Sequence, residues 1–194
     1  MTYIETLHGH EASITQIAAK NNQNKILSCG EDKTIRVFKI DAGTQLVFKA
    51  FSVHSAAIDC CCFLNKSDFI VGSQDGSLSM WTENSKKPIF VEKRAHDGKW
   101  ITALAIFGGS ENKWSDLVAT GSSDGFLRFW RILGETGNTQ IKQIGKVKLE
   151  GYINSLKFNV SRNSLLVGVG REHRFGRWEV IKMAKNQVFE ILFD

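Results

Sequence analysis

The chain has 194 residues, and its hydrophobic content of 42% with a single proline favours a folded protein over a disordered one. No apolar run reaches the roughly 18 residues that a membrane-spanning helix needs, and the first residues lack the basic and apolar regions of a secretory signal, so we expect no membrane association. The net charge of +5 is uneven, since residues 140–185 carry 10 basic and 3 acidic side chains. Such a basic half fits a polyanionic partner such as nucleic acid, or else an ordinary solvated face.

The four cysteines are Cys29 and the run Cys60, Cys61 and Cys62. Their spacing matches neither a zinc site nor a disulfide framework, because three adjacent cysteines in a strand point to alternating faces. We therefore expect free, buried or half-buried thiols and a reducing compartment such as the cytosol or nucleus.

One pattern occurs four times along the chain: an acidic residue in a tight turn, followed six positions later by an aromatic ring. The acidic positions recur at intervals of 43, 49 and 48 residues, a period typical of four-stranded propeller blades. The four pairs are Asp32 with Phe38, Asp75 with Trp81, Asp124 with Trp130, and Glu172 with Trp178.

Short alternating or β-branched segments bounded by turn residues predict four strands in each unit. In the first two units, the predicted strands lie within 13–17, 25–30, 34–38 and 45–51, and then 58–60, 69–72, 78–81 and 89–92. In the last two, they lie within 101–104, 117–121, 127–130 and 141–149, and then 153–158, 165–169, 174–178 and 188–193. An insert at 108–115 predicts a protruding loop in the third unit.

The predicted fold is all-β, with the whole chain, 1–194, forming part of a β-propeller. Its four-stranded blades span about 7–51, 52–94, 95–149 and 150–193, and residues 1–6 form the outer strand of a missing preceding blade. Open terminal blades would expose apolar faces and strand edges. We therefore expect either a piece of a longer propeller or a protein whose ends another chain covers.

Histidine, hydroxyl and carboxylate side chains occur together in the units and resemble nucleophilic machinery. A catalytic set would occur once, whereas this one recurs in degraded forms, so we interpret it as a hydrogen-bonded chain that satisfies buried polar groups. Its predicted members are His10, Ser28, Asp32, His54, Asp75, Trp81, His96, Thr120, Asp124, Trp130, Glu172 and Trp178. Unit two has Val71 at the hydroxyl position, and unit four lacks the histidine. We predict no catalytic residue, no metal site, no cofactor and no small-molecule substrate.

Most candidates for binding lie in the fourth unit, which departs most from the repeat, and Trp100 comes from the third. Arginines and lysines supply phosphate donors there, beside rings that can stack. The predicted RNA- or partner-binding residues are Trp100, Tyr152, Arg171, His173, Arg174, Arg177, Lys182 and Lys185. Packing between blades is the alternative for the two aromatic residues, and an outward position on an ordinary strand is the alternative for Arg177.

The units resemble WD repeats, as shown by Leu7-His8-Gly9-His10, Ser122-Ser123-Asp124-Gly125 and the closing aromatic residues. The run Gly170 to Trp178 makes the chain similar to the C-terminal half of the U3 small nucleolar RNA-associated WD-repeat family. The resemblance implies seven blades and a non-catalytic nucleolar subunit of the small-subunit processome, acting in pre-ribosomal RNA processing. The implied partners are U3 small nucleolar RNA and box C/D snoRNP or processome proteins. The alternative is a WD-repeat scaffold that binds proteins without RNA.

Overall fold

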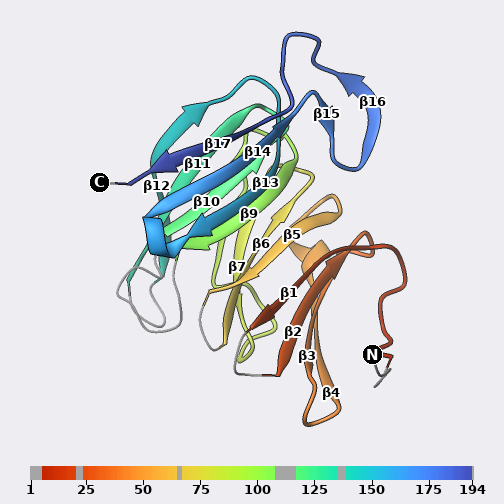
Figure 1. The fold of residues 1–194 in the computed structure, drawn as a ribbon. Helices are drawn as coiled ribbons and strands as arrows, with labels where there is room; N and C mark the ends of the chain where they lie inside the picture. Colours follow the sequence, from red (N-terminus) through yellow and green to blue (C-terminus); the bar gives the residue numbers. More distant parts are fainter. Residues whose placement is uncertain (1–5, 21–23, 65–66, 108–116, 135–138, 194) are drawn as a thin grey trace, which may run out of the picture.

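The computed structural model describes residues 6–20, 24–64, 67–107, 117–134 and 139–193, and every regular element in them is a strand except two single 3₁₀ turns. These turns are η1 (Ala50–Ser52) and η2 (Val160–Arg162). The predicted all-β class is confirmed. The main sheets follow one another in chain order and fan out from a common inner edge, where strands β1, β5, β9 and β13 are neighbours (Figure 1). The predicted outer strand at 1–6 and the insert at 108–115 fall almost wholly outside the described residues.

The first sheet is an antiparallel meander in the order β1-β2-β3-β4. Its strands are β1 (Ile14–Lys20), β2 (Lys25–Gly30), β3 (Thr34–Lys39) and β4 (Thr44–Lys49). The β2–β3 turn needs a left-handed residue, and Lys33 adopts it with a φ of 57°. Asp32 supports this turn by accepting hydrogen bonds from the backbone N–H and the hydroxyl of Thr34, at 2.9 and 2.8 Å.

The second and third sheets repeat this four-stranded order. The second contains β5 (Ile58–Phe63), β6 (Asp68–Ser73), β7 (Leu78–Thr82) and β8 (Phe90–Glu92). The third contains β9 (Ile101–Phe107), β10 (Leu117–Ser122), β11 (Phe126–Leu133) and β12 (Gln140–Lys148). Each predicted strand of these two units overlaps an observed one.

The fourth sheet differs from the prediction, because it has three strands in the described residues, in the order β13-β14-β17. They are β13 (Tyr152–Asn159), β14 (Ser164–Gly170) and β17 (Gln187–Leu192). The segment 174–178, predicted as the third strand, instead belongs to a separate hairpin of β15 (Glu172–His173) and β16 (Gly176–Val180). The segment predicted as the outer strand, 188–193, takes the third position.

Side-chain chemistry explains this exchange of strands. The segment 187–193 places Phe189, Ile191 and Phe193 on one face, and all three pack against the core between the third and fourth sheets. The segment 174–178 offers Arg174 and Arg177 instead, whose charges cannot be buried without partners. Burial of apolar surface therefore pairs β14 with β17 and leaves the arginine-rich segment outside the sheet.

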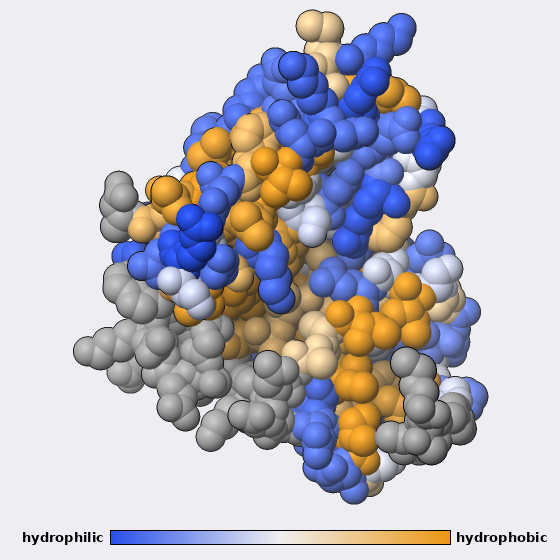
Figure 2. Space-filling view, viewed as in Figure 1, coloured by the Kyte–Doolittle hydropathy of each residue, from blue (hydrophilic) through white to orange (hydrophobic). Residues whose placement is uncertain are grey.

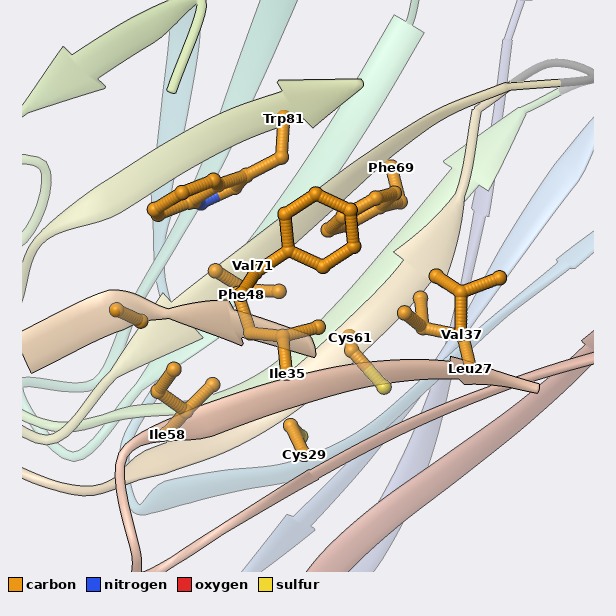
Figure 3. Packing of buried hydrophobic residues seen from close by; sticks show 11 residues of the cluster. Leu27, Cys29, Ile35, Val37, Phe48, Ile58, Cys61, Phe69, Val71 and Trp81 are labelled. Atoms are coloured by element: carbon orange, nitrogen blue, oxygen red, sulfur yellow. The ribbon is translucent and has the colours of Figure 1, made fainter. Parts of the chain in front are cut away.

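The core is divided into three apolar clusters, one between each pair of neighbouring sheets. Between the first two sheets, the ring of Phe48 packs edge-on against Phe69 and Trp81, with centroids 5.1 and 6.0 Å away (Figure 3). Blades approach closely at Gly121, where an added Cβ would lie 2.2 Å from Cγ2 of Ile153 on the next inner strand. The sheets thus stack face to face, as repeat units must when none can bury its face alone.

The cysteines are free thiols, as predicted, and they lie within these clusters. Cys29, Cys60 and Cys61 are buried, and Cys62 is half-buried. Burial raises the pKa of the Cys62 thiol to about 11, which keeps it protonated and unreactive at neutral pH. The described residues also contain no helix long and apolar enough to cross a membrane.

Candidate functional site

The polar residues of the third unit form one continuous hydrogen-bonded chain. The indole N–H of Trp130 donates to the hydroxyl oxygen of Thr120 at 2.8 Å, and that hydroxyl lies 2.8 Å from Nε2 of His96. The opposite ring nitrogen of His96 lies 3.1 Å from the carboxylate of Asp124 in the turn. Burial lowers the pKa of His96, so the ring is neutral and each polar atom of the chain has a partner.

The second unit builds the same chain with substituted residues. Its hydroxyl comes from Ser79, which accepts from the indole N–H of Trp81 at 2.7 Å and lies 2.7 Å from Nε2 of His54. Ser77 then bridges His54 to the carboxylate of Asp75. Ser79 lies directly across the β6–β7 ladder from Val71, so the hydroxyl has moved to the cross-strand position.

The first unit has a shorter chain that lacks an indole. His10 lies 2.9 Å from Asp32 and 2.7 Å from the hydroxyl of Ser28. These three sets tie each turn to its strands, and all their ring nitrogens are used internally. Such an arrangement leaves none of these histidines free to act as a general base.

Glu172 and Trp178 do not form this chain, which corrects their predicted role. Glu172 pairs with Arg177 at 3.1 Å near the surface, and Trp178 is 60% exposed. Their segment lies outside the sheet, so neither residue reaches a buried donor. Gly176 allows the indole to lie over the hairpin, because an added Cβ there would lie 1.9 Å from Cζ3 of Trp178.

An aromatic cluster surrounds His173 where the β15–β16 hairpin meets the sheets. The ring of His173 lies 4.9 Å from Trp100, 5.2 Å from Trp178, 5.5 Å from Phe175 and 5.8 Å from Tyr152, between centroids. Trp100 also contacts Trp178 at 5.7 Å. Trp100 precedes β9 and Tyr152 opens β13, so the cluster fixes the hairpin over the ends of two inner strands. The packing alternative for these two residues thus holds in part, since Tyr152 is 4% exposed.

Burial sets the protonation of this cluster. It lowers the pKa of His173, with the Arg174 charge as a second cause, and Nδ1 accepts a hydrogen bond from the backbone N–H of Phe175 at 3.2 Å. Nε2 of His173 is buried without a partner among the described residues. Burial, together with a hydrogen bond to Glu179 and its charge, raises the pKa of Tyr152 to about 12. The cluster is therefore uncharged at neutral pH.

Four hydrogen bonds clamp the hairpin to the propeller. The side-chain amide of Asn154 donates to the carbonyl of Glu172 at 2.8 Å and accepts from the N–H of Arg174 at 3.1 Å. Asn186 accepts from the N–H of Arg171 at 2.9 Å. The guanidinium of Arg174 lies over the ring of Phe175 at 4.3 Å and donates to the carbonyl of Asp59 on β5 at 2.6 Å. Arg174 thus bridges the fourth unit to the second.

The other four basic residues predicted to bind point outward. Arg171, Arg177, Lys182 and Lys185 are all exposed. Figure 2 shows mainly hydrophilic residues over the upper part of this face, where Figure 1 places the hairpin. The predicted binding residues therefore lie in or next to the β15–β16 hairpin, where Trp100, Tyr152 and His173 pack together and Arg171, Arg177, Lys182 and Lys185 are exposed.

Sequence reasoning missed the residues that anchor the hairpin, namely Asn154, Asn186 and Asp59. The asparagines could have been suspected, because this residue type often bonds backbone groups in irregular segments. Asp59 gave no such signal, since its carbonyl meets Arg174 across 115 residues of sequence.

Comparison with a family model gives matches to the WD domain, G-beta repeat, at residues 1–39, 45–82 and 87–131. An Arabidopsis thaliana U3 snoRNP-associated protein-like protein, EMB2271, is 34% identical over 96% of this chain and 40% of its own length. Human U3 small nucleolar RNA-interacting protein 2 is 38% identical over 75% of this chain and 30% of its own length. The chain thus spans less than half the length of the curated relatives it matches.

Two solved structures agree with this fold over nearly the whole chain. The structure of U3-55K superposes with a TM-score of 0.88 at 36% identity and covers 98% of this chain and 58% of that one. The crystal structure of the RRP9 WD40 repeats gives a TM-score of 0.85 at 36% identity, covering 96% of this chain and 56% of the other. Similarity therefore extends through the fourth unit, beyond the last match to the family model.

Proposed function

Because the chain belongs to the WD-repeat family, we propose that it forms part of a non-catalytic subunit of the U3 small nucleolar ribonucleoprotein within the small-subunit processome. It acts in pre-ribosomal RNA processing by binding small nucleolar RNA and neighbouring proteins. The supporting observation is the similarity to U3-55K, which extends over 98% of this chain at 36% identity. A nucleolar location follows from this assignment.

The β15–β16 hairpin supplies the RNA-binding surface of this proposal. Arg171 and Arg177 are exposed to solvent, although Nε of Arg177 pairs with Glu172. Guanidinium is suited to bidentate phosphate contacts. Trp178 lies beside them with 60% of its surface exposed, available to stack on an unpaired base. Arg174 has a different role, because its guanidinium is bound to Asp59 and positions the hairpin.

A rigid scaffold explains the mechanism better than catalysis does. The histidines of the three repeat networks are bound on both ring nitrogens, and the thiols of Cys60, Cys61 and Cys62 have raised pKa values. The described residues hold no group of three side chains suited to a metal ion. The chain therefore acts by holding its hairpin in place, and phosphate contacts set its position on RNA.

A protein-binding scaffold without RNA is the second candidate, and one observation favours it. Met183 is 82% exposed and follows the hairpin, close in sequence to exposed Trp178. Exposed methionine and tryptophan are residue types that protein partners bind. Salt dependence separates the candidates, because phosphate contacts release counterions and apolar contacts do not.

The double variant Arg171→Ala/Arg177→Ala tests the proposal. Because it removes two phosphate-binding groups, it should bind U3 small nucleolar RNA about tenfold or more weakly and reduce the slope of log K against log salt by about 1.4. Fluorescence anisotropy over a salt series measures both.

The matched control is Lys87→Ala/Arg162→Ala, which removes two exposed charges that lie outside the hairpin. Arg162 lies 4.0 Å from Glu190, a weak surface pair, so its removal should leave the fold intact. Equal RNA affinity and equal slope for the two double variants would refute the hairpin as the RNA-binding surface.

A further inference from the structure

A second basic surface lies on the third sheet, away from the hairpin. Strands β11 and β12 carry five cations and no carboxylate, namely Arg128, Arg131, Lys142, Lys146 and Lys148. Strand β12 is the outer edge of its sheet. We use the name basic edge for Lys146, Lys148 and the ring of Phe126 between them.

Three cations converge on the single ring of Phe126. The Nζ atoms of Lys146 and Lys148 lie 5.5 and 5.8 Å from its centroid, and Cζ of Arg128 lies 5.8 Å away. Pairing places Phe126 opposite Lys148 and Arg128 opposite Lys146 in the β11–β12 ladder. The ring therefore holds the two ammonium groups as neighbours on one face.

These two ammonium groups have no ion-pair partner in the part of the chain that the structure describes. The third cation at the ring, Arg128, does have partners among the described residues, because its guanidinium binds Asp97 and Asp124 at 2.8 and 3.2 Å. No described carboxylate forms an ion pair with Lys146 or Lys148, and both lysines are exposed. Like charges placed side by side repel, and a bound anion relieves that repulsion.

Protection of an edge strand does not account for this arrangement. Lysine on an outer strand does prevent edge-to-edge pairing. The other outer strands carry fewer lysines, since β4 has one, Lys49, and β8 has none. Lys49 pairs with Thr34 just as Lys148 pairs with Phe126, two residues after the turn carboxylate in each case. Thr34 offers no ring, and among the described residues Lys49 makes no cation–π contact.

We propose that the basic edge binds the phosphate backbone of RNA. Lysines two residues apart on a strand are about 7 Å apart, a spacing similar to that of successive phosphates along one strand. Lysine is depleted at protein interfaces, whereas it is a common phosphate donor, which favours RNA over an acidic protein. The ring of Phe126 is covered by cations, so this surface reads charge and not base identity. This inference rests on the proposed function and adds a second point of RNA contact to it.

The double variant Lys146→Gln/Lys148→Gln tests the basic edge with polyuridylate as the probe. The slope of log K against log salt should become shallower by about 1.4, because each phosphate that a lysine neutralises on a single strand adds about 0.7 to it. The control Lys49→Gln/Lys87→Gln has the same net charge as the test variant, and it removes lysines from elsewhere on the surface. It should keep the wild-type slope.

The outcomes separate this inference from the proposed function. If the unaltered chain binds neither polyuridylate nor U3 RNA, both fail. If it binds RNA and the Lys146→Gln/Lys148→Gln slope equals the control slope, the basic edge alone is refuted. Polyglutamate serves as a probe for an acidic protein. If Lys146→Gln/Lys148→Gln abolishes polyglutamate binding and leaves the RNA slope unchanged, the surface binds an acidic protein and the inference is overturned. Should the double variant not fold, each single variant must show about half the change in slope.

Discussion

At the scale of single residues, hydrogen-bonding capacity is retained more strictly than residue identity. The second unit replaces the hydroxyl of Thr120 in the third unit with that of Ser79 on the opposite strand, and the chain from indole to carboxylate stays complete. An unsatisfied buried donor costs about 1–3 kcal/mol, so a hydroxyl that is absent from one strand must be replaced nearby. A repeat alignment alone does not reveal this, because the substitute comes from a different strand.

Asp59 on the inner strand β5 is a buried carboxyl group with incomplete hydrogen bonding. It is fully buried, Oδ1 accepts from Gln74 at 3.1 Å, and Oδ2 has no partner among the described residues. Burial raises the pKa of Asp59 from 3.8 to about 6, although Gln74 and the Arg174 charge oppose the shift. The ionised carboxylate therefore destabilises the fold at neutral pH.

Asp59→Asn should stabilise the chain at neutral pH by about 1–3 kcal/mol, since it replaces a buried charge with a neutral group of nearly equal shape. Folding takes up a proton at Asp59 between pH 3.8 and about 6, so this residue makes stability fall as pH rises through that window. Chemical denaturation of both proteins over a pH series measures the difference. The two curves should converge at acid pH, and a variant less stable than wild type at neutral pH would contradict the account.

At the scale of elements, the strands of the first three units were predictable because each unit combines an apolar alternation with a turn carboxylate. The third strand of the fourth unit was not predictable, because Glu172 and Trp178 match the repeat pattern in a segment that has no apolar face. Burial of Phe189 and Ile191 decided the pairing, and only three-dimensional packing reveals that competition. Trp100, Tyr152 and His173 were each predicted as binding candidates, but their contact around one ring and the anchoring asparagines were not.

Asn154→Ala should loosen the β15–β16 hairpin without unfolding the propeller. The variant lacks the two hydrogen bonds that join Asn154 to Glu172 and Arg174, each contributing about 1 kcal/mol. Amide hydrogen exchange in 172–180 should then become faster, by on the order of tenfold.

Asn159→Ala is the control for this prediction. Asn159 lies at the end of the same strand, and its side chain does not cap the following turn. Exchange in the hairpin should be unchanged in this variant. If Asn154→Ala also leaves exchange at its wild-type rate, the clamp does not hold the hairpin.

At the scale of the whole molecule, the end sheets carry apolar side chains on their outward faces. Ile17 of β1 is 60% exposed, and Val188 and Leu192 of β17 are 73% and 65% exposed. Hydrophobic residues cover the region of β1 in Figure 2. In a propeller such faces meet further blades, and the chain spans only 58% of the U3-55K structure that it matches. The RNA surface proposed above belongs to the part of the propeller described.

The most direct test of the account is ultraviolet crosslinking of the chain to U3 small nucleolar RNA, with the crosslinked peptides mapped by mass spectrometry. We expect crosslinks within 171–185, centred on exposed Trp178 and the arginines beside it. Absence of any crosslink to U3 RNA, or crosslinks confined to the first two units, would contradict the account.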